Sequence, residues 1–297
     1  MDGRVVARIL VLLFIFTGTI LVVNKINNRG VEEFSVEMEQ ATLPIVYVRY
    51  NDRFINTLHG YTGKVDTTYF RDTITPMDYG KTIELWADQA KDTYGSYEYE
   101  LRSQYQGDLI ENGSVTELTH AEGYDKIRVS FRTDLEELQE YVLVLKAMSG
   151  EEVAVRYYTR VVVENNFHAD KLLDFVETFN KVLFNKEEAE TVISKSIEPN
   201  EDGNNEYLSE IDIHSSFETI TFADLNPTRL TKPIASIKEI DDSYAIIQLK
   251  YMISAQENRV LESYYITENY RVRYVDEDNV YLLDYNRKQE ALFVTDN

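Results

Sequence analysis

Apolar and polar residues alternate strictly through much of the chain between residues 42 and 163. In the stretch SYEYELRSQ, Tyr97, Tyr99 and Leu101 alternate with charged side chains. Because successive side chains of a strand point to opposite faces, this pattern predicts short antiparallel strands with one buried face, packed as a two-sheet sandwich. Three later stretches predict further inward sets: Ile127, Val129 and Phe131; Tyr141, Leu143 and Leu145; and Val155, Tyr157, Val161 and Val163.

Turn-forming residues separate the expected strands. The sequence ENGS at residues 111–114 contains the Asn-Gly pair that favours a tight hairpin turn with positive φ. Nearer the C-terminus, the polar sequences IDDS, AQEN, DEDN and NRKQ are expected to connect strands in the same way.

The apolar spacing changes to that of a helix after this first region. It predicts helices near residues 167–184 and 186–196. Asn165 or Asn166 is the expected N-cap of the first helix, and Asn185 that of the second. The strands that follow, to residue 294, then form an antiparallel meander. A helix whose apolar stripe covers one face of such a sheet makes an α+β domain.

One charged residue interrupts the apolar face of a strand in this meander. Glu268 lies in register with Ile266 and Tyr270, on the face expected to be buried. A buried carboxylate needs a hydrogen-bonding partner, and the nearby Arg271 and Arg273 point to the opposite face unless a bulge intervenes.

The most apolar stretch of the chain runs from residue 9 to residue 23. It gives about 22 Å of helix at ~1.5 Å per residue, and about 28 Å with residues 5–7 added and Arg8 reaching the headgroups. The following NKINN lacks the small side chains that signal peptidase requires. We therefore expect an uncleaved transmembrane signal anchor at residues 9–25, in preference to a cleaved signal peptide or a cytosolic protein with an apolar N-terminus.

Positive charge flanking this run sets the expected orientation. Arg4, Arg8 and the α-amino group precede it, whereas Lys25 and Arg29 follow it, which favours a cytoplasmic N-terminus and an extracytoplasmic bulk of the chain. The expected organisation is a cytoplasmic tail at residues 1–8, the anchor at 9–25, a linker at 26–41, a sandwich at 42–164 and an α+β domain at 165–297.

Three local patterns give the first region a family resemblance. TIELWAD with Trp86, then YEYELRS, then LEELQEYVLVLKA with Leu135 before Tyr141, resemble strands B, C and F of fibronectin type III or immunoglobulin-like modules. The resemblance implies that Trp86 packs in the core and that Leu135 and Tyr141 form a tyrosine corner, whose hydroxyl ties the loop before strand F to the backbone. It implies no activity.

This sequence departs from the family pattern at two places. The usual Pro-Gly before the tyrosine is replaced by ELQE, and residues 51–78 make a longer connection than the ordinary one between strands A and B. An extra hairpin or a related sandwich topology therefore stays open.

Composition excludes several kinds of chemistry. The formal charge of −22, from 52 acidic against 30 basic residues, would repel phosphate backbones and anionic headgroups, so nucleic-acid binding is not expected. The chain has no cysteine, which excludes disulfides, thiolate metal sites and cysteine nucleophiles. The acidic balance is consistent with the solubility of a displayed domain.

No catalytic, cofactor or metal motif is found. His59, His120, His168 and His214 are far apart in sequence, and HGYTGK lacks the spacing of a phosphate-binding loop. Ser215 and Ser216 beside His214 lack a nucleophile elbow. The acidic sequences NEDGNN and DEDN leave weak calcium binding as a less favoured alternative.

The chain contains 22 tyrosines, most of them at inward positions. Tyr158 and Tyr265 lie in the opposite register and are the expected partner-facing aromatics, for a protein or glycan partner. We therefore predict a non-enzymatic, single-pass membrane protein that serves as a binding, scaffold or sensor module of a bacterial-type cell envelope. The alternative is an envelope hydrolase acting on polysaccharide, which would need two carboxylates about 5 to 9.5 Å apart in a cleft.

Overall fold

The computed structural model describes residues 43–89, 94–163, 167–257, 260–277 and 279–292, together with Gly18. The chain from Leu43 onward forms one compact unit. Apart from Gly18, the predicted tail, anchor and linker lie outside the described residues. Within the described part of the chain, no helix has both the length and the apolar character needed to cross a membrane. The fold is mainly β, with antiparallel sheets, as the alternation predicts.

The first sheet has five antiparallel strands. They are β1 (Val46–Tyr50), β2 (Arg53–Leu58), β4 (Thr82–Asp88), β7 (Glu117–Ala121) and β8 (Tyr124–Ser130). Their order is β2-β1-β4-β8-β7. The hairpin formed by β1 and β2 turns at Asn51, whose φ of 49° suits asparagine. Its second strand occupies the start of the long connection noted in the sequence, so the extra hairpin is present.

The second sheet also has five strands. They are β3 (Ile74–Met77), β5 (Ser96–Ser103), β6 (Leu109–Ser114), β9 (Glu140–Ser149) and β10 (Glu152–Val163), in the order β3-β10-β9-β5-β6. All neighbours are antiparallel except β3 and β10, which are parallel. The two sheets share one hydrophobic core, in which all predicted inward residues are buried. This arrangement is compatible with the predicted β-sandwich.

Two expectations for this region are wrong. ENGS lies inside β6, paired with β5, and not in a turn. Gly113 packs closely there, because a Cβ at this position would lie 3.1 Å from the ring of Tyr99 and would require that ring to shift. Trp86 does not pack in the shared core, because the register of β4 buries Leu85 and Ala87 and places Trp86 on the outer face of the first sheet.

The tyrosine corner is present in the described loop before β9. The hydroxyl of Tyr141, at the start of that strand, accepts a 2.9 Å hydrogen bond from the backbone N–H of Glu136. The tyrosine ring is buried, and the loop is thereby attached to the end of the strand.

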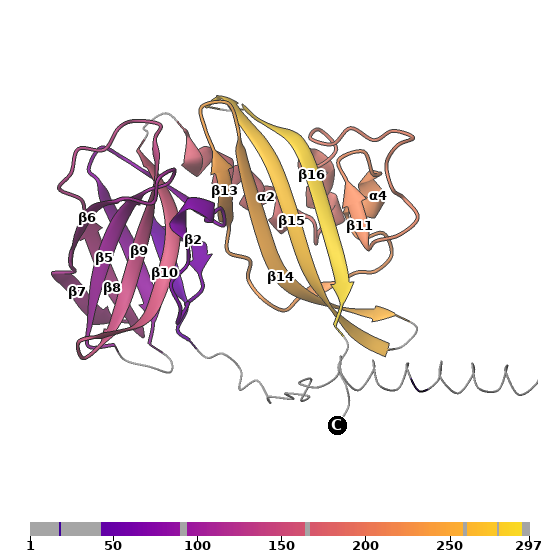
Figure 1. Ribbon diagram of the computed structural model, residues 1–297. Helices are drawn as coiled ribbons and strands as arrows, with labels where there is room; N and C mark the ends of the chain where they lie inside the picture. The colour runs from indigo at the N-terminus through magenta and orange to yellow at the C-terminus, as the bar shows by residue number, and fades with distance from the viewer. Residues whose placement is uncertain are drawn as a thin grey trace, which may run out of the picture. The chain divides into compact units, whose positions relative to one another are not determined.

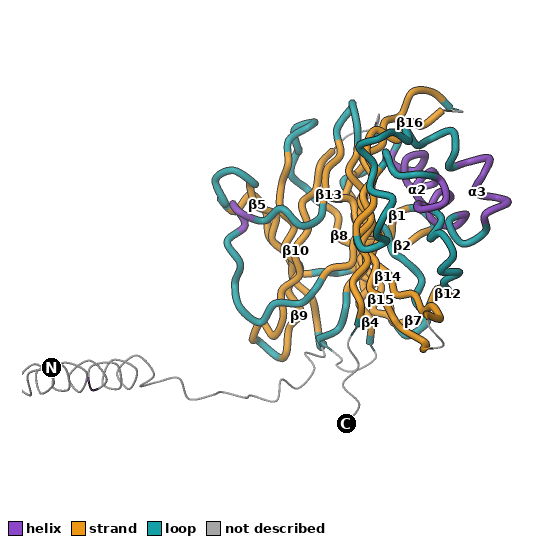
Figure 2. The backbone as a smooth tube through the Cα atoms, turned by 90° about the vertical axis from the view of Figure 1, so that its right-hand side faces the viewer, coloured by secondary structure: helices purple, strands orange, loops and turns teal. Residues whose placement is uncertain are grey.

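The third sheet contains six strands and is covered by helices on one side (Figures 1 and 2). Its strands are β11 (Glu210–Asp212), β12 (Thr228–Arg229), β14 (Ala245–Glu257), β15 (Val260–Asp276) and β16 (Asn279–Ala291), in the order β11-β16-β15-β14-β12, with β13 (Ser236–Ile240) also paired to β14. The sequence NRKQ continues β16, so the turn expected there is wrong.

The helices are α2 (Ala169–Val182), α3 (Lys186–Val192) and the single turn α4 (Phe217–Ile220), which the sequence pattern did not predict. Phe179 packs α2 onto the sheet, with ring centroids 5.5 Å from Tyr270 and 5.3 Å from Tyr285. Asn185 caps α3 as predicted, because its side chain accepts hydrogen bonds from the N–H groups of Glu187 and Glu188.

The cap of α2 differs from expectation. Asn165 and Asn166 lie outside the described residues, and the N-cap position belongs to His168, whose side chain makes no capping hydrogen bond. The imidazole instead stacks on Tyr274, with centroids 3.6 Å apart and planes 11° apart.

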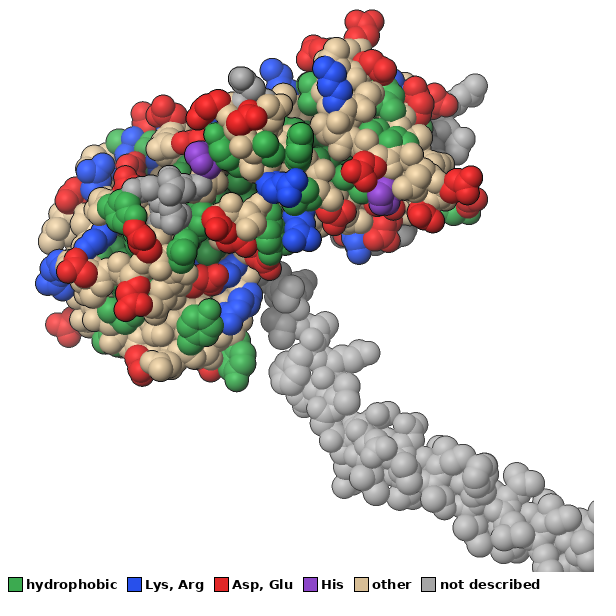
Figure 3. Space-filling model, turned by 90° about the horizontal axis from the view of Figure 1, so that it is seen from above, with side chains coloured by type: hydrophobic (Ala, Val, Ile, Leu, Met, Phe, Trp, Pro, Cys, Tyr) green, Lys and Arg blue, Asp and Glu red, His purple; other side chains and the backbone are tan. Residues whose placement is uncertain are grey.

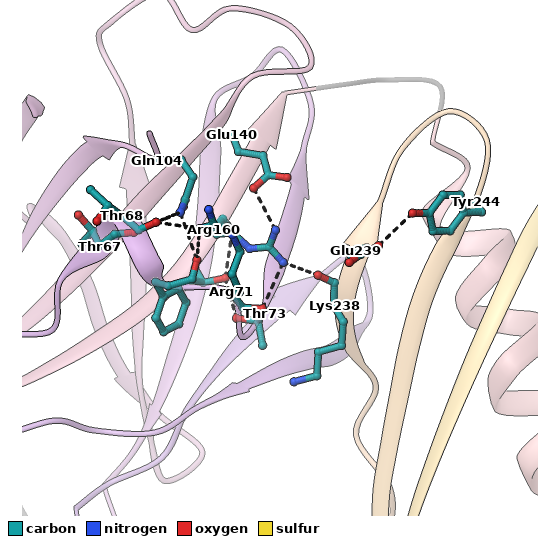
Figure 4. A network of polar contacts seen from close by, with 12 residues as sticks. Thr67, Thr68, Arg71, Thr73, Gln104, Glu140, Arg160, Lys238, Glu239 and Tyr244 are labelled. Carbon is teal, nitrogen blue, oxygen red and sulfur yellow. Dashed lines mark hydrogen bonds and ion pairs between the residues drawn. The ribbon is translucent and has the colours of Figure 1, made fainter. Parts of the chain in front are cut away.

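A polar seam joins the third sheet to the second (Figure 4). Buried Arg160 of β10 donates to the Glu140 carboxylate at 2.9 Å and to the main-chain carbonyl of Lys238 in β13. The Lys238 ammonium is paired with Asp72 at 2.5 Å. The polypeptide on both sides of residue 164 is therefore held together by charged and main-chain contacts.

Candidate functional site

A cavity of about 500 Å³ lies between the β1–β2 hairpin, α2 and the third sheet. Its walls come from four places in the sequence: the hairpin formed by β1 and β2, the last two turns of α2, the segment from β12 to residue 234, and β14. The lining residues are Arg49, Asp52, Arg53, Phe54, Glu177, Asn180, Lys181, Arg229, Lys232, Pro233, Ile234 and Leu249. The hairpin lies next to the segment from β12 to residue 234 because β2 contacts the residues before β13, where the N–H of Asn56 donates to the carbonyl of Ala235 at 2.8 Å.

The charge of this cavity is opposite to that of the whole chain. Five of its twelve lining residues are cations and two are carboxylates, whereas the chain has 30 basic and 52 acidic residues. Acidic side chains are spread over the face drawn in Figure 3, with basic side chains among them. The cavity is thus a local concentration of positive charge on an acidic protein.

The guanidinium of Arg229 has contacts that differ from those of the other cations in the cavity. One terminal nitrogen of its guanidinium donates to the main-chain carbonyl of Asn180 at 3.0 Å and to the Asn180 side-chain oxygen at 2.6 Å. Its Nε is buried and has no hydrogen-bond partner among the described residues. The guanidinium carbon lies 4.3 Å from the ring centroid of Phe184 and 5.3 Å from that of Tyr251. No ion pair to Arg229 occurs within the described ranges.

The two carboxylates of the cavity are both paired with arginine. Glu177 lies 3.1 Å from Arg53, which also contacts Asp174 at 2.5 Å, and Asp52 lies 3.7 Å from Arg49. Burial by itself would lower the pKa of Arg53, but its hydrogen bond to Asp174 and the charges around it raise that pKa. Both carboxylates therefore serve the arginines as counter-ions.

Lys181 and Lys232 are exposed at the edge of the cavity. Neither makes an ion pair with any residue in the described part of the chain. Their ammonium groups are therefore available to a bound molecule.

Behind the cavity, Asn180 connects to the carboxylate that the sequence singled out. Its Nδ2 donates to Oε2 of Glu268 at 2.6 Å. Tyr270 donates to the same oxygen at 2.9 Å, and Tyr285 donates to Oε1 at 2.8 Å. Glu268 is fully buried, and these three donors satisfy it. Arg271 contacts Tyr244 instead, as its register predicts.

The tyrosines around Glu268 are strongly perturbed. Burial, followed by the negative charge of Glu268, raises the pKa of Tyr270 and of Tyr285 well above the ordinary value of 10. Both hydroxyls therefore stay protonated as donors across the physiological range. Burial, followed by the negative charge of Glu268, raises the pKa of Tyr251 well above 10 as well.

Arg287 is a buried cation that sequence reasoning missed. It lies opposite Glu268 in the register between β15 and β16, donates to the carbonyls of Ile220 and Thr219 at 2.7 and 3.2 Å, and sits 3.7 Å from the ring of Phe222. The available signal was the alternation after Tyr285, which places residue 287 on the inward face.

A second feature borders the cavity at Phe54. Four half-buried aromatic rings cover part of the outer face of the first sheet: Tyr47, Phe54, Trp86 and Tyr124. The Trp86 ring lies 5.2 Å from Phe54 and 5.4 Å from Tyr124 between centroids. Lys126 places its ammonium 3.9 Å from the Trp86 ring. We call these four rings the aromatic cluster.

The two tyrosines predicted to face a partner differ in position. Tyr158 does lie on the outer face of the second sheet, but it is only 3% exposed, because the segment between β2 and β3 covers it. Its hydroxyl accepts a 3.0 Å hydrogen bond from the N–H of Val65, so it is not available to a partner. Tyr265 is half-buried on β15 and remains a prediction.

The other candidates from the sequence do not come together. Among the described residues, no group of three histidine or acidic side chains could hold a metal ion. His120 contacts the buried Asp125, which also accepts a 2.7 Å hydrogen bond from Tyr97. Ser215 donates to the carbonyl of Asn204, and Ser216 caps α4. The serines therefore serve the local structure.

Comparison with known proteins adds no relative. No protein-family model matches the chain, and a search of curated proteins finds no match.

Proposed function

We propose that the protein is a non-enzymatic, single-pass membrane protein of a bacterial-type cell envelope, with its folded part outside the cytoplasm as a binding, scaffold or sensor module. The apolar run at residues 9–23, proposed to be a retained anchor at 9–25, and the charges around it support this location. The observation that carries the binding role is the cationic cavity, which is accessible at its edge and whose carboxylates are already paired.

The strand order supports an immunoglobulin-like sandwich at residues 42–164. With β1, β4, β8 and β7 taken as strands A, B, E and D, the first sheet has the order A-B-E-D after the added β2. With β5, β9 and β10 taken as C, F and G, the second sheet contains C, F and G as neighbours. The tyrosine corner supports the same assignment. Residues 165–297 then form the α+β domain, with α2 on the third sheet.

The aromatic cluster supports the same class of function. Half-buried rings beside cations suit a protein or glycan partner, since they offer apolar area together with polar edges. Tyr265 would offer a further ring on the third sheet. We propose no nucleic-acid partner, because the overall charge of −22 opposes it.

The alternative is a polysaccharide hydrolase of the envelope. Such an enzyme needs one carboxyl group as acid and another as base or nucleophile. In the cavity, each carboxylate is already paired with an arginine, and no pair of free carboxyl groups lines it. Binding is therefore the better supported function.

Location is tested by labelling the lysines of intact cells with a membrane-impermeant amine reagent. The proposal expects labelling of the full-length protein without lysis. A protein that is labelled only after lysis contradicts the extracytoplasmic location.

The binding role is tested by capture from solubilised membranes. We expect the full-length protein to retain an envelope component that a variant with Phe54→Ala and Trp86→Ala loses, while the exposed control Lys195→Gln retains it. Turnover of an envelope glycan by the purified protein, abolished by Glu177→Gln, would instead support the hydrolase.

A further inference from the structure

We infer that the cationic cavity binds a small organic anion, one that carries a phosphate or carboxylate group on an apolar or aromatic body. This inference deepens the proposed binding function and rests on it. Arg229 is the central contact for the anionic group, and Lys181 and Lys232 are secondary contacts at the edge.

The first argument is the uncompensated charge of Arg229. Arg229 is half-buried, and a cation partly removed from water is costly unless a counter-ion and hydrogen-bond acceptors replace the lost solvent. Arg229 has two acceptors, both on Asn180, and its Nε has none within the described residues. The nearest acid in this network is Glu268, which lies beyond Asn180 and already accepts three hydrogen bonds. An anion in the cavity would supply the missing charge.

The second argument is the fixed position of the guanidinium. Asn180 is 1% exposed and is held from behind by Glu268, so it cannot easily turn away from Arg229. The rings of Phe184 and Tyr251 support the guanidinium from the side. An arginine that is immobilised in advance loses little conformational freedom when an oxyanion binds, which favours affinity.

The third argument is the composition of the remaining wall. Phe54, Pro233, Ile234 and Leu249 line the cavity together with the cations. A bare inorganic ion would leave this apolar surface in water, whereas an anion with an apolar body would cover it. The volume of about 500 Å³ is within the range of ~300–1,000 Å³ that small-molecule sites occupy.

The overall negative charge does not prevent such binding. The sequence alone predicts repulsion of anions, because the formal charge is −22. Exposed charges are largely screened beyond about 8 Å at physiological ionic strength. The cations that line the cavity are therefore the charges that a bound anion experiences most strongly.

The test uses the purified full-length protein in detergent, titrated by calorimetry with phenyl phosphate, benzoate, inorganic phosphate and phenol. We expect phenyl phosphate or benzoate to bind, phenol to bind at least about ten-fold more weakly, and affinity to fall as salt is raised. A further experiment measures binding of the protein to vesicles with and without an anionic phospholipid. Binding to anionic vesicles that phenyl phosphate displaces identifies a lipid headgroup as the source, whereas binding of soluble probes alone identifies a free metabolite.

Variants locate the site. Arg229→Gln should weaken phenyl phosphate binding by about ten-fold or more, which corresponds to the loss of one charge-assisted hydrogen bond. The double variant Lys181→Gln with Lys232→Gln alters exposed side chains that the fold does not need, and should weaken binding several-fold. Lys195→Gln, exposed on the described surface but outside the cavity, should bind as the unaltered protein does. Circular dichroism confirms that each variant is folded.

Two results would overturn the inference: no binding of either organic anion by the folded protein, or unchanged affinity in both cavity variants. The proposed function is tested independently of this inference. If surface labelling and capture succeed but no anion binds, only the anion site is wrong. If an anion binds but the protein is cytosolic, the site stands and the proposed location is wrong.

Discussion

Asn56 and Ile237 are 181 residues apart in the sequence, and the backbone N–H of Ile237 donates a 2.8 Å hydrogen bond to Oδ1 of Asn56. The Nδ2 of Asn56 donates to the carbonyl of Ile74 at 2.8 Å and to Oγ1 of Thr75 at 3.0 Å. This side chain is fully buried. One amide therefore satisfies polar groups of β3 and β13 together, and it connects the second and third sheets.

Asn56→Ala should destabilise the protein by roughly 3 kcal/mol, because it leaves buried polar groups of β3 and β13 without partners. Chemical denaturation, followed by circular dichroism, measures this. Asn51→Ala is the matched control, since Asn51 has nearly the same backbone angle, with φ of 49° against 50°, but is exposed, and its side-chain hydrogen bond to Asp170 is made in contact with solvent. The control should cost only about 1 kcal/mol, from the left-handed conformation. Equal losses in the two variants would show that the buried hydrogen bonds of Asn56 contribute nothing beyond backbone strain.

Removing single tyrosine hydroxyls should show how much each donor to Glu268 contributes to the free energy of unfolding. Tyr285 is the donor to Oε1 in the described structure, whereas Oε2 has both Asn180 and Tyr270. Tyr285→Phe should therefore cost about 2–3 kcal/mol, more than Tyr270→Phe at about 1 kcal/mol. Urea denaturation compares the two. If Tyr270→Phe is the more damaging change, the assigned hydrogen-bond pattern is wrong.

Glu111 makes stability depend on pH in the acid range. Burial alone would raise its pKa, but hydrogen bonds from the hydroxyls of Tyr99 and Thr133 and from two backbone N–H groups lower it from 4.5 to about 2. Its stabilising contribution is therefore complete above pH 4.5 and is lost as the pH falls toward 2. A shift of this size corresponds to roughly 3 kcal/mol.

Glu111→Gln should lower the free energy of unfolding by about 2–3 kcal/mol at pH 7 and by much less at pH 2. Denaturant titrations at both pH values measure the difference. The exposed Glu117→Gln, also in the first region, should change little at either pH. A loss that is the same at pH 7 and pH 2 would exclude the carboxylate charge as its cause.

Trp86 is the single tryptophan of the chain, and it lies on the outer face of the first sheet. Acrylamide should quench its native fluorescence readily, more than expected for a ring inside the shared core. Lys126→Met should change the emission, because the Lys126 ammonium lies 3.9 Å from the ring. Native emission that resists quenching until the protein unfolds would mean that the ring is buried after all.

The alternation of residues predicted the mainly β fold and its inward side chains, because period two directly reports which face of a strand is buried. It also identified Glu268 as a buried carboxylate in need of partners. It missed the covering of Tyr158, because the segment that covers it is far away in sequence and has no periodic pattern of its own. The register of a strand shows on which face of the sheet a side chain lies, but it does not show which segment packs on that face.

The cavity could not be predicted from the sequence. Its cations belong to three separate segments, and each one alone resembles an ordinary solvated charge in an acidic chain. Trp86 was misplaced for a different reason. A family resemblance supplied its position, whereas its own neighbours Leu85 and Ala87 take the inward register of β4.

The residues that line the cavity are synthesised at different times. Its first wall, the hairpin of β1 and β2, leaves the ribosome long before Arg229 and Lys232, and N-terminal parts generally fold first during synthesis. The first and second sheets can therefore fold before the residues that complete the cavity have been synthesised. A polypeptide that ends before residue 229 lacks Arg229 and Lys232 and is incapable of binding an anion there. Anion binding would therefore distinguish the full-length protein from prematurely terminated chains.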